Sequence, residues 1–71
     1  MEEKLFAHYS AKVNRVLASG NRYSFEQLQQ ETMIDEADFS FVLDKMIKNG
    51  TVSRSLIDDV MTYYIYNERY Y

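Results

Sequence analysis

The chain of 71 residues contains no cysteine, a single histidine and only two glycines. Without cysteine there is no disulfide framework, no thiolate zinc site and no thiol redox motif. The single histidine excludes a His-Glu-x-x-His metal site, and no glycine-rich phosphate loop is present. We therefore expect no enzyme, no catalytic residues, no cofactor and no metal, and no small-molecule substrate is evident.

Long hydrophobic runs are also missing. The chain opens on Met1-Glu2-Glu3-Lys4, without a basic region followed by an apolar stretch. This pattern predicts neither a signal peptide nor a membrane span, so we expect a cytoplasmic protein, or a nuclear one in a eukaryote. Apolar residues make up 46% and charged residues 27% of the chain, a composition typical of one globular domain over residues 1–71.

Three segments carry apolar residues at helical spacing, at about residues 3–19, 25–31 and 36–49. The two glycines, Gly20 and Gly50, follow the first and the third segment, where a left-handed residue ends a helix. In the first segment, Lys4, His8, Ala11 and Arg15 lie opposite the apolar face. These spacings predict a bundle of three amphipathic helices.

The second and third helices have recognisable starts. Ser24 and Gln27 form a capping box, and Asp35 is the expected N-cap of the third helix. The short connection between these helices has the length found in a helix-turn-helix. We expect Met33 and Ile34 in this connection to fill the gap between the helices.

The third helix has one apolar face and one outward face. The expected buried residues are Phe39, Leu43, Met46 and Ile47, with Val42 at the border. The expected outward residues are Ala37, Phe41, Asp44 and Lys48, flanked by Asp38 and Lys45. Phe41 is unusual, because an aromatic side chain on a polar face either covers part of the domain or marks a binding surface.

After Gly50 the apolar residues alternate, which predicts two strands at about 51–57 and 60–66 and a tail at 67–71. A turn at Asp58-Asp59 would join the strands. The expected pairs are Leu56 with Met61, Arg54 with Tyr63, and Val52 with Ile65, so that the apolar members face the core. One edge of this hairpin stays open to a strand from a partner or from a second copy.

In these features the chain resembles the winged-helix superfamily over about residues 3–66. The matching features are the segment Ser24-Phe25-Glu26-Gln27-Leu28, the spacing of Leu43, Met46, Gly50 and Val52, and the two-stranded wing. The resemblance implies an α+β fold that is mainly α with a small β hairpin, a three-helix winged helix-turn-helix. In DNA-binding members of the superfamily, the third helix enters the major groove and the wing tip meets the backbone or the minor groove.

The charges weigh against that docking mode. The chain has a formal net charge of −3, and the positions that would face DNA include Glu36, Asp58 and Asp59. Two like charges about 4 Å apart cost about 1 kcal/mol even in bulk water, and more where water is excluded. We therefore interpret duplex DNA as a disfavoured target.

Two functions remain. The favoured one is a non-catalytic module that binds a protein partner or a second copy of itself, because exposed aromatic residues are frequent at interfaces. Its predicted contacts are Ala37, Phe41, Asp44, Lys45, Lys48, Tyr64 and Tyr66. The alternative is a small DNA-binding transcriptional regulator, in which dimerisation brings Lys45 and Lys48 of two copies together. Its predicted contacts are Lys4, Lys12, Arg15, Arg22, Ser40, Lys45, Lys48 and Arg54.

Overall fold

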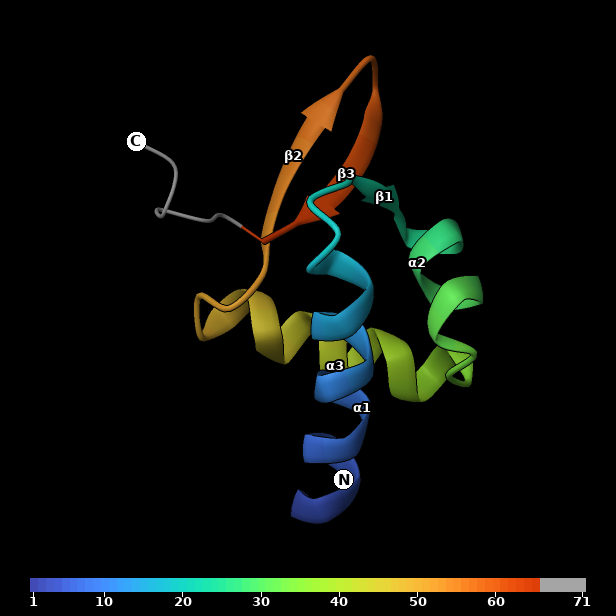
Figure 1. The fold of residues 1–71 in the computed structure, drawn as a ribbon, viewed down its shortest axis with the longest axis vertical. Coiled ribbons are helices and arrows are strands. Elements are labelled where there is room, and N and C mark those ends of the chain that lie inside the picture. The colour runs from blue at the N-terminus through green and yellow to red at the C-terminus, as the bar shows by residue number, and fades with distance from the viewer. Residues whose placement is uncertain (66–71) are drawn as a thin grey trace.

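The computed structural model describes residues 1–65, which form three helices and a small antiparallel sheet. The elements in chain order are α1 (Glu3–Leu17), β1 (Tyr23–Ser24), α2 (Phe25–Thr32), α3 (Glu36–Lys48), β2 (Ser53–Ile57) and β3 (Val60–Tyr64). Figure 1 shows α1 along the long axis, α3 crossing behind it, and the β2–β3 hairpin at the end opposite the N-terminus. The predicted three-helix winged helix-turn-helix is confirmed. Tyr66 and the expected tail at 67–71 lie outside the described residues.

The two glycines stand just beyond helix ends, in the left-handed region with φ of 87° at Gly20 and 84° at Gly50. After α3, the backbone N–H groups of Thr51 and Val52 both donate to the carbonyl oxygen of Met46, at 2.9 and 3.1 Å. These bonds tie the entry of the wing to the last turn of α3. As a consequence β2 begins at Ser53, later than the predicted position 51.

The helix starts follow the predicted capping pattern. The backbone N–H of Gln27 donates to Ser24 Oγ at 3.3 Å, and the backbone N–H of Ser24 donates to Gln27 Oε1 at 3.2 Å. At α3, the N–H of Ala37 donates to Asp35 Oδ2 at 3.2 Å. Both predicted caps are confirmed, and together they fix the beginning of α2 and α3.

The core lies where the three helices meet the inner face of the sheet. Its buried apolar residues are Val13, Leu17, Leu28, Ile34, Phe39, Val42, Leu43, Met46, Val52 and Tyr63. The ring of Phe25 packs edge-on against Phe39, with centroids 4.9 Å apart, and against Tyr63 at 6.5 Å. These aromatic contacts join α2, α3 and β3 into one core.

The sheet has one strand that the sequence pattern did not reveal. β1 pairs antiparallel with β3, placing Tyr23 beside Tyr63 and Ser24 beside Thr62. β3 is therefore the central strand, in the order β1-β3-β2. Two residues are too few for an alternating pattern, and Ser24 carries a helix-capping signal at the same time.

Two of the three predicted hairpin pairs are confirmed, since Leu56 pairs with Met61 and Arg54 pairs with Tyr63. The ladder ends at Ser53 and Tyr64, so the expected pair of Val52 with Ile65 is not part of it. Val52 is buried and instead bonds to the end of α3.

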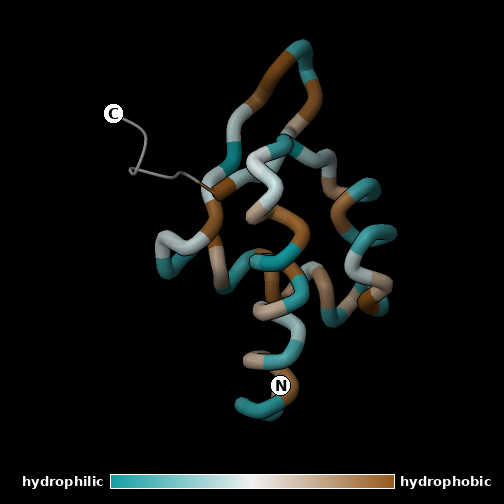
Figure 2. Tube along the Cα trace, viewed as in Figure 1, coloured by the Kyte–Doolittle hydropathy of each residue, from teal (hydrophilic) through white to brown (hydrophobic). Residues whose placement is uncertain are grey.

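Five burial predictions were wrong, and one of them is Ile47, which was expected to be buried and is half-buried. Leu56 is 64% exposed and Met61 is also exposed, because the hairpin extends beyond the helices that form the core. Figure 2 shows a hydrophobic stretch on each strand of the hairpin, next to the hydrophilic tip. Met33, expected to fill a gap, is 86% exposed, and Val42 is fully buried rather than at the border.

Candidate interaction surface on α3

The outward face of α3 is open to solvent along its length. Ala37, Ser40, Phe41, Asp44, Lys45 and Lys48 are all exposed, and Asp38 is half-buried. Asp44 Oδ2 and Lys48 Nζ form an exposed ion pair at 3.1 Å, one helical turn apart. The structure therefore places the predicted outward residues of α3 on one accessible surface.

An aromatic patch occupies the middle of this face. Phe41 is 45% exposed, and Lys45 Nζ lies 5.7 Å from the centroid of its ring. The same ammonium group lies 5.6 Å from the ring centroid of Phe6 in α1. We call these three residues the α1–α3 patch. Contacts of this kind contribute about 0.5–1 kcal/mol at exposed sites, so Lys45 is held over two rings.

Phe6 was not among the predicted site residues. Its helical spacing placed it on the apolar face of α1, and it does pack half-buried against the core. Its proximity to Lys45 follows from the crossing of α1 and α3. Phe6, Lys45, Lys48 and Asn49 line a shallow hollow of about 320 Å³ beside the patch. This hollow combines an aromatic wall with two ammonium groups.

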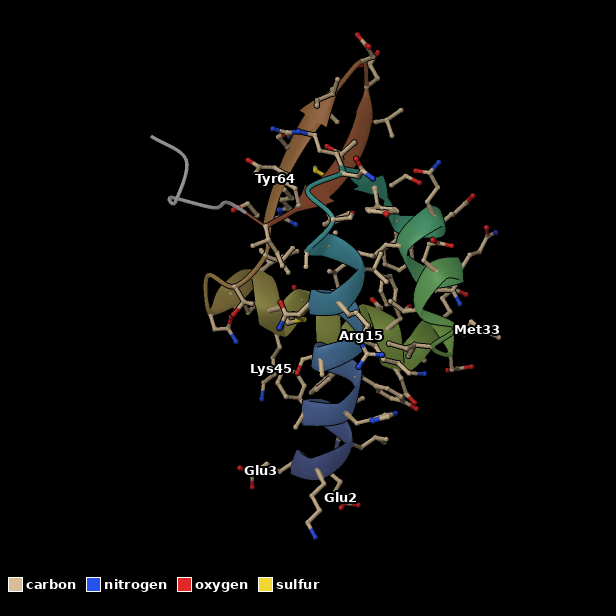
Figure 3. The ribbon with its side chains drawn as sticks, viewed as in Figure 1. Glu2, Glu3, Arg15, Met33, Lys45 and Tyr64 are labelled. Carbon is tan, nitrogen blue, oxygen red and sulfur yellow. The ribbon has the colours of Figure 1, made fainter. Side chains whose placement is uncertain are left out.

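The remaining basic residues do not gather with Lys45 and Lys48. Lys12 and Arg15 line a different hollow, of about 190 Å³, together with Met33 at the end of α2. In Figure 3, Lys45 and Met33 lie on opposite sides of α1, with Arg15 near the middle. Lys4 is exposed in the first turn of α1. The cations of α1 and α3 therefore form separate groups.

The two arginines of the wing region lie on opposite faces of the sheet. The Arg22 guanidinium donates to Ser55 Oγ at 2.9 Å and stacks on the Tyr64 ring, with Cζ 3.9 Å from its centroid. Arg54 pairs with Tyr63 in the register, and side chains of neighbouring strand residues alternate between faces. Tyr64 is half-buried and partly covered by Arg22, so it offers less free ring surface than predicted.

Three acidic residues that were expected from the sequence to face DNA lie at the start of α3 and at the wing tip. Glu36 is exposed in the first turn of α3. Asp58 and Asp59 form the wing tip, exposed and left-handed with φ of 51° and 65°. Two consecutive left-handed residues are typical of the type I′ turn that closes a two-residue hairpin, and aspartate tolerates this conformation. The conformation of the turn therefore explains why aspartates occupy it.

Neither a metal site nor a membrane helix is seen in residues 1–65. No three histidine or carboxylate side chains in this range are grouped so that they could hold a metal ion. None of the helices in the same range combines the length and the apolar character needed to cross a membrane.

The helix-turn-helix of α2 and α3, followed by the β2–β3 wing, defines a winged-helix fold. The chain is similar to the crystal structure of a MarR family transcriptional regulator from Silicibacter pomeroyi DSS, with a TM-score of 0.74 and 17% sequence identity. The similarity covers 84% of this chain and 41% of the regulator chain, so the chain spans less than half of that protein's length. No model of a known protein family matches the sequence, and no curated protein matches it either.

Proposed function

We propose that this chain is a winged-helix module of a transcriptional regulator and that the outward face of α3 contacts duplex DNA. The observation that carries the proposal is the shared fold with a transcriptional regulator over 84% of the chain. The uncovered outward face of α3 supports it, because the second helix of a helix-turn-helix is the one that enters the major groove. The structural similarity thus favours duplex DNA, the target that the charges of the sequence had disfavoured.

The charges limit how such binding would work. Lys45 and Lys48 provide two cations on α3, while Glu36, Asp58 and Asp59 would approach the phosphates. Each neutralised phosphate contributes a salt-dependence slope of about −0.9, so two lysines give a slope near −2. We expect weak binding by one copy, in the ordinary non-specific range of about 10⁻⁴ to 10⁻⁶ M at physiological salt.

A matched pair of double variants tests whether α3 supplies the contacts. The α3 variant carries Lys45→Ala and Lys48→Ala. The α1 variant carries Lys4→Ala and Arg15→Ala, on the far face of α1. Each variant removes two positive charges. We expect the α3 variant to lose at least about tenfold in affinity for a duplex, measured by fluorescence anisotropy, because two phosphate contacts disappear. The α1 variant should change the affinity for the duplex by less than about threefold. Equal losses would indicate a general charge effect and would contradict the proposed surface.

A second candidate function is protein binding through the α1–α3 patch. It is favoured by one observation, the 45% exposure of Phe41 on a polar helix face with Lys45 above its ring. Aromatic residues, phenylalanine among them, are enriched at the centres of protein interfaces. This candidate and DNA binding use the same helix face.

Self-association through this patch has a direct test. If the patch joins two copies, Phe41→Ala abolishes dimer formation in sedimentation equilibrium, whereas Met33→Ala, which truncates an exposed apolar residue outside the patch, leaves it unchanged. If both variants associate as the unaltered chain does, the patch does not join two copies.

A further inference from the structure

The β2 strand is an open sheet edge. In the order β1-β3-β2, β3 is the strand that pairs with β2, so the other side of Ser53–Ile57 has no strand partner among residues 1–65. Natural edge strands are commonly blocked by proline, by a bulge or by charged side chains, lysine above all. β2 contains neither lysine nor proline, its register with β3 runs without interruption from Ser53 to Ile57, and its one charged residue is Arg54.

The register determines which backbone groups are free. Ile57 and Val60 flank the two-residue turn, and in such a hairpin the flanking residues exchange both backbone hydrogen bonds. These bonded pairs alternate with unbonded ones, so Ser55 also points its backbone groups toward β3. The hydroxyl of Thr62 in β3 donates to the carbonyl oxygen of Ser55 at 3.1 Å, which agrees with this orientation. Arg54 and Leu56 therefore direct their backbone N–H and C=O groups to the open edge.

The side chains along this edge are complementary to those of the same edge in a second copy. Arg54 and Leu56 lie two residues apart on one face of β2, and Asp58 begins the turn that follows Ile57, with a left-handed φ of 51°. If two β2 strands pair antiparallel with Leu56 opposite its own counterpart, Arg54 of each copy lies beside the acidic turn of the other, which begins with Asp58. The pairing would also cover part of Leu56, which is 64% exposed, and of its neighbour Met61.

We propose that β2 pairs antiparallel with β2 of a second copy, centred on Leu56, to form a two-fold symmetric dimer with a continuous six-stranded sheet. The backbone bonds of Leu56 and two reciprocal Arg54–Asp58 ion pairs join the copies. Five residues on each side cover less than the roughly 800 Å² per partner of a standard interface, so the dimer is weak. This inference does not depend on DNA being the target.

A cysteine probe tests the register. The chain has no cysteine, so Leu56→Cys introduces a single thiol on the two-fold axis. Directly opposed residues in a bonded antiparallel pair have Cα atoms about 5.5 Å apart, which a short thiol-to-thiol cross-linker spans. With such a bis-maleimide reagent at about 200 µM protein, Leu56→Cys should give a covalently linked dimer at least tenfold faster than Ser40→Cys, an exposed control on α3. Equal rates for the two variants would overturn the proposed register.

A charge exchange tests the ion pairs and separates this dimer from association through the α1–α3 patch. In sedimentation equilibrium, Arg54→Glu and Asp58→Lys should each weaken the dimer at least tenfold. The combined variant should return to within about threefold of the unaltered chain, since the pairs are reversed and restored. Phe41→Ala should leave this dimer intact. A monomer up to about 500 µM, insensitivity to Arg54→Glu, or loss of association in Phe41→Ala would each overturn the proposal.

Discussion

Phe39 and Phe41 provide the sharpest test of the orientation of α3, because the same substitution is made two residues apart on opposite faces. Phe39 is fully buried and its ring lies 4.9 Å from that of Phe25, whereas Phe41 is 45% exposed. Phe39→Leu removes an aromatic pair, worth about 0.5–1.5 kcal/mol, and leaves unfilled volume, for a total of about 1–3 kcal/mol. Phe41→Leu should change the free energy of unfolding by no more than about 0.5 kcal/mol.

Urea denaturation distinguishes these outcomes. For a chain of this size the slope of unfolding free energy with urea is about 1 kcal/mol per molar. The midpoint should therefore fall by about 1–3 M for Phe39→Leu and by at most about 0.5 M for Phe41→Leu. The total stability of such a domain is only about 4–10 kcal/mol, which is why leucine rather than alanine is chosen. Equal shifts for the two variants, or the larger shift at Phe41, would refute the assignment of the two faces.

Three further variants test local geometry, each by thermal or urea unfolding. Ser24→Ala removes the acceptor for the Gln27 N–H and should destabilise the domain by about 0.5–2 kcal/mol; an unchanged midpoint would mean that this cap contributes nothing. Met33→Gly relieves a left-handed residue with φ of 57° and should stabilise by roughly 0.5–1 kcal/mol, so any loss of stability would contradict the strain argument. Asp58→Asn combined with Asp59→Gly supplies the favoured type I′ turn and should stabilise the hairpin by about 0.5–1 kcal/mol, which a lower midpoint would disprove.

The parts of the fold that depend on local signals could be predicted from the sequence. The capping box at Ser24 involves residues three apart, and the hairpin register follows from a two-residue turn between alternating strands. The outward face of α3 follows from helical periodicity alone. These predictions needed no knowledge of how distant segments pack.

The misplaced residues required the tertiary arrangement. Alternation shows which face of the wing is apolar, but it does not show how far the helices extend beneath it, so Leu56 and Met61 were expected to be buried. Met33 and Ile34 are adjacent and both apolar, and periodicity does not decide which one points inward. The structure buries Ile34 and places Met33 in the left-handed position after α2.

The residues of the candidate site also divide into those that local spacing predicts and those that depend on the tertiary arrangement. Phe41 and Lys45 were predicted on the outward face from spacing within one helix. The contribution of Phe6 depends on the crossing of α1 and α3, and the stacking of Arg22 on Tyr64 depends on the loop before β1 reaching the sheet. Contacts between elements far apart in the chain leave no periodic signal in one sequence.

The most direct test of the proposed function is a nuclear magnetic resonance titration of the ¹⁵N-labelled chain with a DNA duplex of about 20 base pairs at low salt. This measurement locates the contact and remains informative for weak, non-specific binding. We predict shifts in the backbone amides of α3 around Ser40, Phe41 and Lys45, and these shifts should diminish as salt is added. Shifts confined to the Lys4 and Arg15 face of α1, or no shifts at millimolar DNA, would contradict the proposed function.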